Sequence, residues 1–266
     1  MTDAFKSYQL AALTTVGDAP DRRCHYAVAM EERGAFECRC CDYADARLSF
    51  FKPGMEMPMA VGTRVLSFHE SLVRSSALRL HFADYSFFGY RHPLESLYIS
   101  LRERAVASRL FDSVAEELAH GDDQFTATLL AEKINLLLTN CRRFYQRQFI
   151  MREDYCAMHV AKAEKIVDAF YAEGHGCDIP PIDVCAEQMK TSAAYATDVI
   201  RFITGKTFRE FAQLRQLHMA KHLLSSTDRT VPDIARSLGF PSTACFEEFF
   251  SIVAGTSATA FRQSRC

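Results

Sequence analysis

The side chains best suited to specific chemistry lie near the C-terminus, on two short segments with helical periodicity. On the first, residues 192–203, Arg201 carries a guanidinium that can read a guanine edge or grip a phosphate. If the segment enters a groove of DNA, the residues expected to face that groove together with Arg201 are Ala194, Tyr195, Thr197 and Asp198. For Tyr195, half-buried packing is an equally good interpretation.

The second segment, residues 242–253, has no Lys or Arg. Its exposed positions are predicted to be Thr243, Ala244, Glu247 and Glu248. Carboxylates can accept a hydrogen bond from cytosine N4, but the negatively charged phosphates of DNA repel them. The residues near the turns that suit phosphate anchoring are Lys190, Lys206, Thr207, Arg209, Thr256 and Ser257. For each lysine alone, a solvated surface residue is the simpler interpretation.

Cysteine and histidine give no catalytic constellation. Strand alternation would place Cys38 and Cys40 on one face and Cys41 on the other, near Cys24 and His25. Such a pair could bind a soft metal or form a redox couple, but zinc-site spacing is absent and buried strand cysteines are the simpler interpretation. The nine histidines contain no His-x-His pair, and neither Gly-x-Ser-x-Gly nor a phosphate loop occurs. We therefore expect no enzyme, cofactor or metal site.

Two helix-turn-helix units would position the candidate side chains. In the second, Val231, Ile234, Ala235 and Leu238 form one apolar stripe, Gly239 suits a left-handed C-cap, and Ser242 is an N-cap for a helix from Thr243 to Val253. In the first, a helix over 182–189 precedes Ser192, the N-cap of a helix to Thr204 that Gly205 ends. A helix from Phe208 would connect the units rigidly and hold both recognition helices about one DNA turn apart.

The stretch from Ile182 to Arg262 resembles the C-terminal domain of AraC/XylS-type transcription regulators. The residues that carry the resemblance are 186–189, Ser192, Tyr195, 204–208, Arg215, 220–224, 231–240, Phe246, Phe250, 255–256 and 261–262. The resemblance implies a regulator that binds promoter DNA, with a small-molecule effector, a homodimer and RNA polymerase as further candidate partners.

Two departures from the family pattern concern packing and charge. Ala193 and Ala196 stand where the family usually has Pro and a core Leu, and Thr191 replaces a common aliphatic residue. A buried Leu-to-Ala loss costs about 2–5 kcal/mol, so either a neighbour compensates or this unit packs loosely. Glu248 lies where the family often has a basic residue. We therefore expect the first unit to supply most of the DNA affinity.

The first hundred residues are predicted to be β-rich. Strand candidates are 35–40, 46–51 and 64–68, with a turn at Lys52-Pro53-Gly54. The spacing fits a small sandwich or barrel, and a weaker resemblance over the first 160 residues, carried by residues 48–54 and 136–149, implies a cupin-like effector or dimerisation domain. Helices are expected over 125–148 and 154–172. The broad apolar stripe of the first favours a partner helix from a second subunit, or else packing on the barrel alone.

The expected fold class is α+β: a cupin-like β-barrel with a helical dimerisation segment over 1–152, a helix and linker over 153–180, and an all-α tandem helix-turn-helix domain over 181–266. The 266 residues have no apolar run long enough to span a bilayer and no visible signal peptide, so we expect a cytoplasmic protein. From Lys162 onward, 12 Lys and Arg balance 12 Asp and Glu, which is unusual for a DNA-binding domain. The alternative is a sensor or protein-interaction module with weakened DNA binding.

Overall fold

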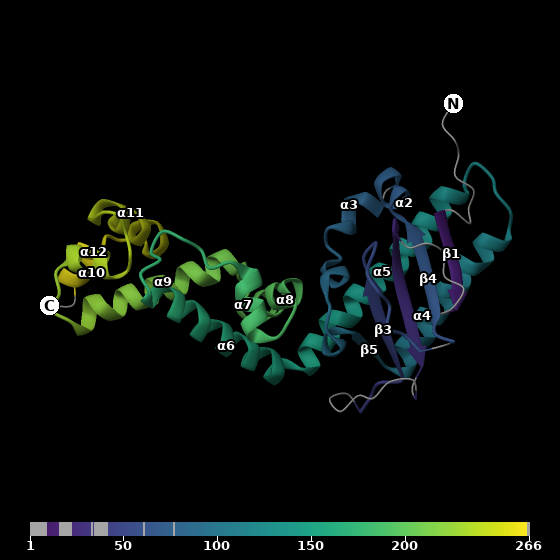
Figure 1. The fold of residues 1–266 in the computed structure, drawn as a ribbon, viewed down its shortest axis with the longest axis horizontal. Coiled ribbons are helices and arrows are strands. Elements are labelled where there is room, and N and C mark those ends of the chain that lie inside the picture. Colours follow the sequence, from purple (N-terminus) through teal and green to yellow (C-terminus); the bar gives the residue numbers. More distant parts are fainter. Residues whose placement is uncertain are drawn as a thin grey trace. The chain divides into compact units, whose positions relative to one another are not determined.

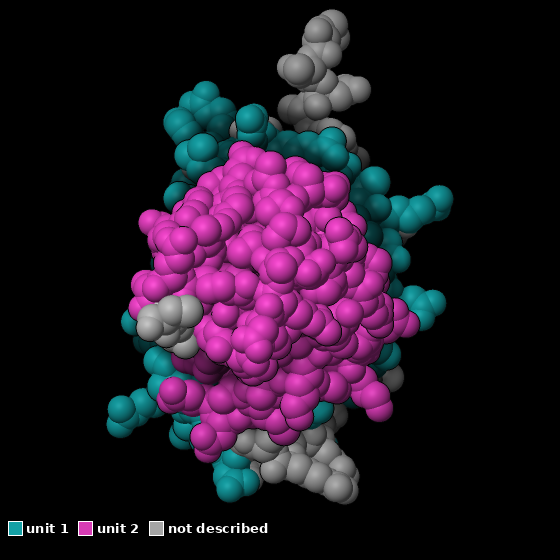
Figure 2. All heavy atoms as spheres, turned by 90° about the vertical axis from the view of Figure 1, so that its left-hand side faces the viewer, with its two compact units in different colours: residues 1–151 teal, residues 152–266 magenta. Residues whose placement is uncertain are grey.

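The computed structural model divides into two compact units, residues 1–151 and 152–266 (Figure 2). The residues that it describes are 10–15, 23–32, 34, 42–60, 62–76 and 78–264. The strand candidate at 35–40 and the cysteines at 38, 40 and 41 lie outside this described part.

The compact unit of residues 1–151 contains one five-stranded antiparallel sheet (Figure 1). Its strands are β1 (Ala11–Thr15), β2 (His25–Glu32), β3 (Ala46–Phe51), β4 (Arg64–His69) and β5 (Leu97–Ile99), in the order β1-β4-β2-β3-β5. The predicted strands at 46–51 and 64–68 are confirmed. The predicted closed barrel is not, because the described strands form an open sheet whose edges are β1 and β5.

Both faces of the sheet are covered. Ala27 and Ala29 of β2 face Phe51 and Val65, and Met55, Met57 and Met59 of the segment after β3 pack against this group. On the other face, Phe50 of β3 contacts Phe87, with ring centroids 4.3 Å apart, and Phe87 stacks on Tyr145. Burial on both faces makes β2 an uninterrupted buried run from Ala27 to Glu31.

The helices of the first unit pack against this sheet. They are α2 (Glu70–Ser75), α3 (Leu78–Phe82), the 3-10 turns η1 (Ser86–Gly89) and η2 (Pro93–Glu95), α4 (Leu101–Ala119) and α5 (Thr126–Met151). Helix α5 lies against α4 and β5 and confirms the helix predicted over 125–148. Its predicted apolar stripe is buried inside the unit except for Leu129, so packing within the chain accounts for most of it.

The compact unit of residues 152–266 has helices as the sole regular secondary structure among its described residues. It contains α6 (Glu153–Ala172), α7 (Ile182–Met189), α8 (Ala193–Thr204), α9 (Phe208–Ser226), α10 (Val231–Ser237), α11 (Thr243–Ala254) and α12 (Ala258–Gln263). Helix α6 packs against α7, α8 and α9, while α9 also contacts α10, α11 and α12. The long α9 therefore belongs to both helix-turn-helix units, as the sequence predicts for the connector.

The described cysteines divide into buried and exposed groups. Cys141, Cys156 and Cys185 are buried, whereas Cys24, Cys177 and Cys245 are exposed. Burial raises the pKa of Cys141 and raises that of Cys156 to about 11, so both stay protonated thiols at neutral pH and pack as small apolar residues. No cluster of three or more metal-ligating side chains occurs among the described residues. None of the helices formed by these described residues is long and apolar enough to cross a bilayer.

Candidate nucleic-acid interface

The first helix-turn-helix unit is built from α7, a tight turn and α8. Lys190 ends α7 in the left-handed conformation (φ 60°, ψ 44°), and the N–H of Thr191 donates to the carbonyl oxygen of Ala186 at 3.0 Å. The hydroxyl of Ser192 then accepts from the N–H of Tyr195 at 3.3 Å, which starts α8 at the predicted residue. The turn therefore fixes the orientation of α8 relative to α7.

One face of α8 carries Ala194, Thr197, Asp198 and Arg201, because these positions are spaced i, i+3, i+4 and i+7. Arg201 is exposed and the other three are half-buried. Lys190, Lys206 and Arg209 are also exposed, and none of these four cations makes a direct ion pair with the described residues.

The corner between α8 and α9 gathers two of these cations. Hydrogen bonds from Thr207, together with the charges of Lys206 and Arg201, hold the pKa of Glu210 below its usual range. Arg201 lies in the last turn of α8, and Lys206 directly follows the Gly205 C-cap, so both cations belong to the end of α8 that leads into α9.

Two residues predicted to face DNA have structural roles instead. The ring of Tyr195 is 1% exposed and lies edge-on to His159 of α6, so the packing interpretation is correct and the groove-facing one is wrong. Thr207 is exposed, but its hydroxyl donates to Glu210 Oε2 at 2.8 Å and accepts from the Glu210 N–H in a capping box. Its hydroxyl is therefore already used at the start of α9.

The departures around the first turn have visible consequences. Ala196 is fully buried, so the small side chain at this position lies inside the unit. Thr191 is also buried, and its hydroxyl has no hydrogen-bond partner in the described part of the chain. An unsatisfied buried hydroxyl costs about 1–3 kcal/mol.

Replacing Thr191 by valine should stabilise the first unit. Thr191→Val keeps the branched shape and removes the unpaired hydroxyl, so we expect a gain of about 1 kcal/mol. Amide hydrogen exchange across α7 and α8 should slow roughly fivefold, since 1.4 kcal/mol corresponds to a factor of about ten. Thr197→Val is the matched control, because the Thr197 hydroxyl donates to the Ala193 carbonyl oxygen at 2.8 Å. Equal exchange in wild type and Thr191→Val would contradict the prediction.

The second helix-turn-helix unit places Glu247 and Glu248 of α11 in different environments. Glu247 Oε2 accepts from the Ala258 N–H at 2.7 Å, and Oε1 accepts from the N–H and hydroxyl of Thr259 at 3.1 and 2.6 Å. Glu247 therefore caps the N-terminus of α12, where a carboxylate is favourable, and its predicted role in DNA contact is replaced by this one. Glu248 is exposed.

The remaining predicted positions of the second unit are near the surface. Thr243 is half-buried, whereas Ala244 and Thr256 are exposed. The hydroxyl of Ser257 accepts from the Ala260 N–H at 3.0 Å and acts as the N-cap of α12. On the solvent face of α11, Ile252 is 75% exposed one turn beyond Glu248. This face therefore carries the predicted acidic residue Glu248 and, in addition, an exposed apolar side chain that was not predicted.

Truncating Glu247 should loosen α12. Glu247→Ala leaves two helix N-terminal N–H groups without their acceptor, and the loss of a cap costs about 0.5–2 kcal/mol. Amide exchange in the α12 region should accelerate by up to about thirtyfold in this variant. Glu248→Ala, one residue away, removes a carboxylate that has no hydrogen bond or ion pair to the described residues, so it should leave exchange unchanged. Equal acceleration in both variants would show that α12 does not depend on this cap.

Two contacts that position the helices of the C-terminal domain have no local signal in the sequence. Arg215 of α9 donates from Nε to Asp168 Oδ1 at 3.0 Å and from Nη1 to Glu164 Oε1 at 3.1 Å, which ties α9 to α6. The segment after α6 runs closely under the turn of the second unit, where Gly174 and Gly176 approach Gly239. Arg215 belongs to the family pattern, but nothing local in the sequence indicates either contact.

Comparison with known proteins defines the class of this arrangement. Residues 185–264 match the family model described as "Helix-turn-helix domain". The chain is 30% identical over 94 residues to the melibiose operon regulatory protein of Escherichia coli (strain K12), an alignment that covers 35% of this chain and 31% of that regulator. Residues 185–264 therefore form a helix-turn-helix domain, similar to that of AraC-type regulators. The chain spans less than a third of the length of the regulator that it matches.

Two regulators of known structure are among the proteins that match this chain. An AraC-type transcriptional regulator from Chromobacterium violaceum is 17% identical, covers 41% of this chain and 94% of its own, and has a TM-score of 0.37. ToxT from Vibrio cholerae O395 is 11% identical, covers 95% of each chain, and has a TM-score of 0.34.

Proposed function

We propose that the chain is a sequence-specific DNA-binding transcription regulator in which the first helix-turn-helix unit supplies most of the DNA affinity. The observation that carries this proposal is the corner of Arg201 and Lys206, exposed and without direct ion pairs to the described residues. Arg201 would read a base edge or grip a phosphate, while Lys190, Lys206 and Arg209 would anchor the backbone. Ala194, Thr197 and Asp198 would line the same surface.

The second unit would make a smaller contribution to DNA binding. Its solvent face carries Ala244, Glu248 and Ile252, and no Lys or Arg lies on α11. A carboxylate facing phosphates lowers both the association rate and the affinity. Thr243 and Thr256 could still donate hydrogen bonds, so the unit would position the domain on DNA.

A protein contact is the second candidate role for this face. The exposed Ile252 beside Glu248 resembles a protein-interaction surface more than a groove-reading one. A basic, partly apolar partner surface would fit it, and RNA polymerase is the candidate partner that a regulator of this type implies.

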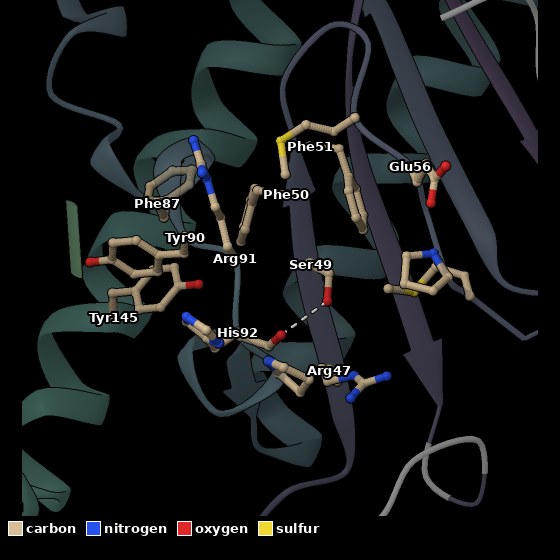
Figure 3. A pocket seen from close by; sticks show the side chains of 15 residues that line it. Arg47, Ser49, Phe50, Phe51, Glu56, Phe87, Tyr90, Arg91, His92 and Tyr145 are labelled. Atoms are coloured by element: carbon tan, nitrogen blue, oxygen red, sulfur yellow. Dashed lines mark hydrogen bonds between the residues drawn. The ribbon is translucent and has the colours of Figure 1, made fainter. Parts of the chain in front are cut away.

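The first unit of the fold would provide sensing or dimerisation. Leu129 and Leu136 of α5 are exposed, as is Phe125 directly before this helix, and a second copy of the chain could cover them in a homodimer. The open sheet carries a pocket that could hold an effector (Figure 3). These roles, together with action in the cytoplasm without a metal or cofactor, complete the proposal.

The DNA-binding proposal is tested by selecting duplexes from a random library with the full chain. Repeated rounds at low salt should enrich one sequence, and the genomic sites that match it identify candidate promoters. Circular dichroism before and after each round verifies that the chain stays folded. A folded protein that enriches no sequence would overturn the proposal.

A further inference from the structure

Two exposed thiols lie in the compact unit of residues 152–266, on segments that are far apart in the sequence. Cys177 belongs to the segment between α6 and α7, and Cys245 lies in the first turn of α11. Both are free cysteines, and neither takes part in the proposed DNA contact. The fold therefore decides whether these two thiols can react with each other.

The two segments meet around the ring of Phe240. A Cβ added at Gly176 would lie 2.8 Å from this ring, so the segment between α6 and α7 touches the turn before α11 (Figure 1). The ring of Phe240 also lies edge-on to that of Phe246, with centroids 5.2 Å apart. Cys177 directly follows Gly176, and Cys245 directly precedes Phe246. Each cysteine is therefore one residue away from the same aromatic contact.

The backbone on both sides of Cys177 is held by hydrogen bonds. The carbonyl oxygen of the buried Gly176 accepts from Gln216 Nε2 of α9 at 2.7 Å. The buried Tyr171 of α6 donates from its hydroxyl to the Asp178 carbonyl oxygen at 3.3 Å. The fold thus holds Cys177 beside the turn that leads into α11, and such positioning makes a reaction between two groups effectively unimolecular.

The two thiols lie in different electrostatic environments. Partial burial raises the pKa of Cys177, and the negative charges that Cys245 and Asp178 can carry raise it further, so Cys177 stays a thiol at neutral pH. At Cys245, the Ser242 hydroxyl donates to Sγ at 3.2 Å, in the first turn of a helix, where negative charge is favourable. Because peroxides react with thiolates, we expect Cys245 to be oxidised first.

We propose that Cys177 and Cys245 form a reversible disulfide when hydrogen peroxide oxidises the chain. The Cys245 thiolate attacks one peroxide oxygen, the O–O bond breaks and hydroxide leaves, which gives a sulfenic acid. The Cys177 sulfur then attacks the Cys245 sulfur, the S–O bond breaks, and the oxygen leaves as water with the Cys177 proton. Two thiols are oxidised, and one peroxide is reduced to two waters once the hydroxide takes up the proton that Cys245 released.

The disulfide would tie the segment after α6 to α11 and so stabilise the second helix-turn-helix unit. A cross-link between residues far apart in the sequence removes conformational freedom from the unfolded chain. We expect amide hydrogen exchange in α10 and α11 to slow roughly tenfold or more on oxidation, and to recover when a small dithiol reduces the disulfide. Peroxide would thereby control how often this unit opens.

Peptide mapping of the full chain tests the proposal. Folded protein at low concentration is treated with peroxide, the remaining thiols are blocked, and peptides are compared by mass spectrometry before and after reduction. We expect a linked pair of peptides that contain Cys177 and Cys245. In Cys177→Ser the pair should be absent, and dimedone should trap the sulfenic acid at Cys245. Cys24→Ser, which removes an exposed cysteine of the other compact unit, should form the pair as wild type does.

Three results would overturn the proposal, and none of them depends on DNA binding. The first is the absence of the linked pair from folded, oxidised wild type. The second is an equal yield of the pair in the folded chain and in the chain unfolded by urea, because the fold would then contribute nothing. The third is amide exchange in α10 and α11 that slows equally in wild type and Cys245→Ser, because the change would then be unrelated to this disulfide.

Discussion

Replacing Gly239 by alanine should loosen the entire second helix-turn-helix unit. Gly239 has a φ of +81°, which costs an L-residue roughly 1–2 kcal/mol. A Cβ there would also lie 1.5 Å from the Gly174 carbonyl oxygen. Because that oxygen belongs to the backbone, no side-chain rotation can relieve the clash. The turn or the segment after α6 must therefore move. We expect a total loss of roughly 3 kcal/mol or more, the size that steric overpacking produces.

The measurement is amide hydrogen exchange in α10 and α11 of the full chain, which should accelerate about a hundredfold or more in Gly239→Ala. Gly255→Ala is the matched control, because its φ is +74° and no atom lies within 4 Å of the added Cβ. Gly176→Ala isolates the steric part, since its Cβ would lie 2.3 Å from the Leu238 carbonyl oxygen. Equal effects of Gly239→Ala and Gly255→Ala would show that the close approach contributes nothing.

Replacing Arg201 by alanine should remove most sequence discrimination. A well-oriented arginine contact to a base is worth about 1–3 kcal/mol, so affinity for a selected duplex should fall roughly five- to hundredfold. Affinity for a scrambled duplex should fall much less. Fluorescence anisotropy with both duplexes at one salt concentration measures the two effects.

Arg236→Ala is the matched control for this experiment. Arg236 is an exposed arginine of α10 that pairs with Asp233 at 3.2 Å, so its removal takes one positive charge from the second unit. We expect only a small, sequence-independent change in that variant. If Arg236→Ala costs more discrimination than Arg201→Ala, the second unit is the principal reader and our assignment is wrong.

The C-terminal domain was predictable because its signals are local. The Ser192 cap, Gly205 in a left-handed C-cap (φ 68°) and the apolar stripe of α10 all lie within one or two turns of the helices that they define. Contacts made across the fold were not predictable. Tyr195 is buried by α6, and Glu247 caps α12 eleven residues away. Helical periodicity alone cannot place either of these partners.

The fold of the N-terminal compact unit, residues 1–151, was harder to predict from the sequence, for a different reason. Strand β2 is buried on both faces, so its sequence shows no alternation, and β5 has only three residues. Helices α2 and α3 are too short for a 3.6-residue period to register. The barrel was inferred from the spacing of strands and from family resemblance, and neither determines whether a sheet closes.

The most direct test of the account is the salt dependence of DNA binding by the full chain. Association constants for the selected and the scrambled duplex are measured between about 50 and 200 mM salt. We predict that both fall as salt rises, with the selected duplex preferred by roughly a thousandfold or more throughout. A folded protein that binds neither duplex at low salt, or binds both equally, would contradict the account.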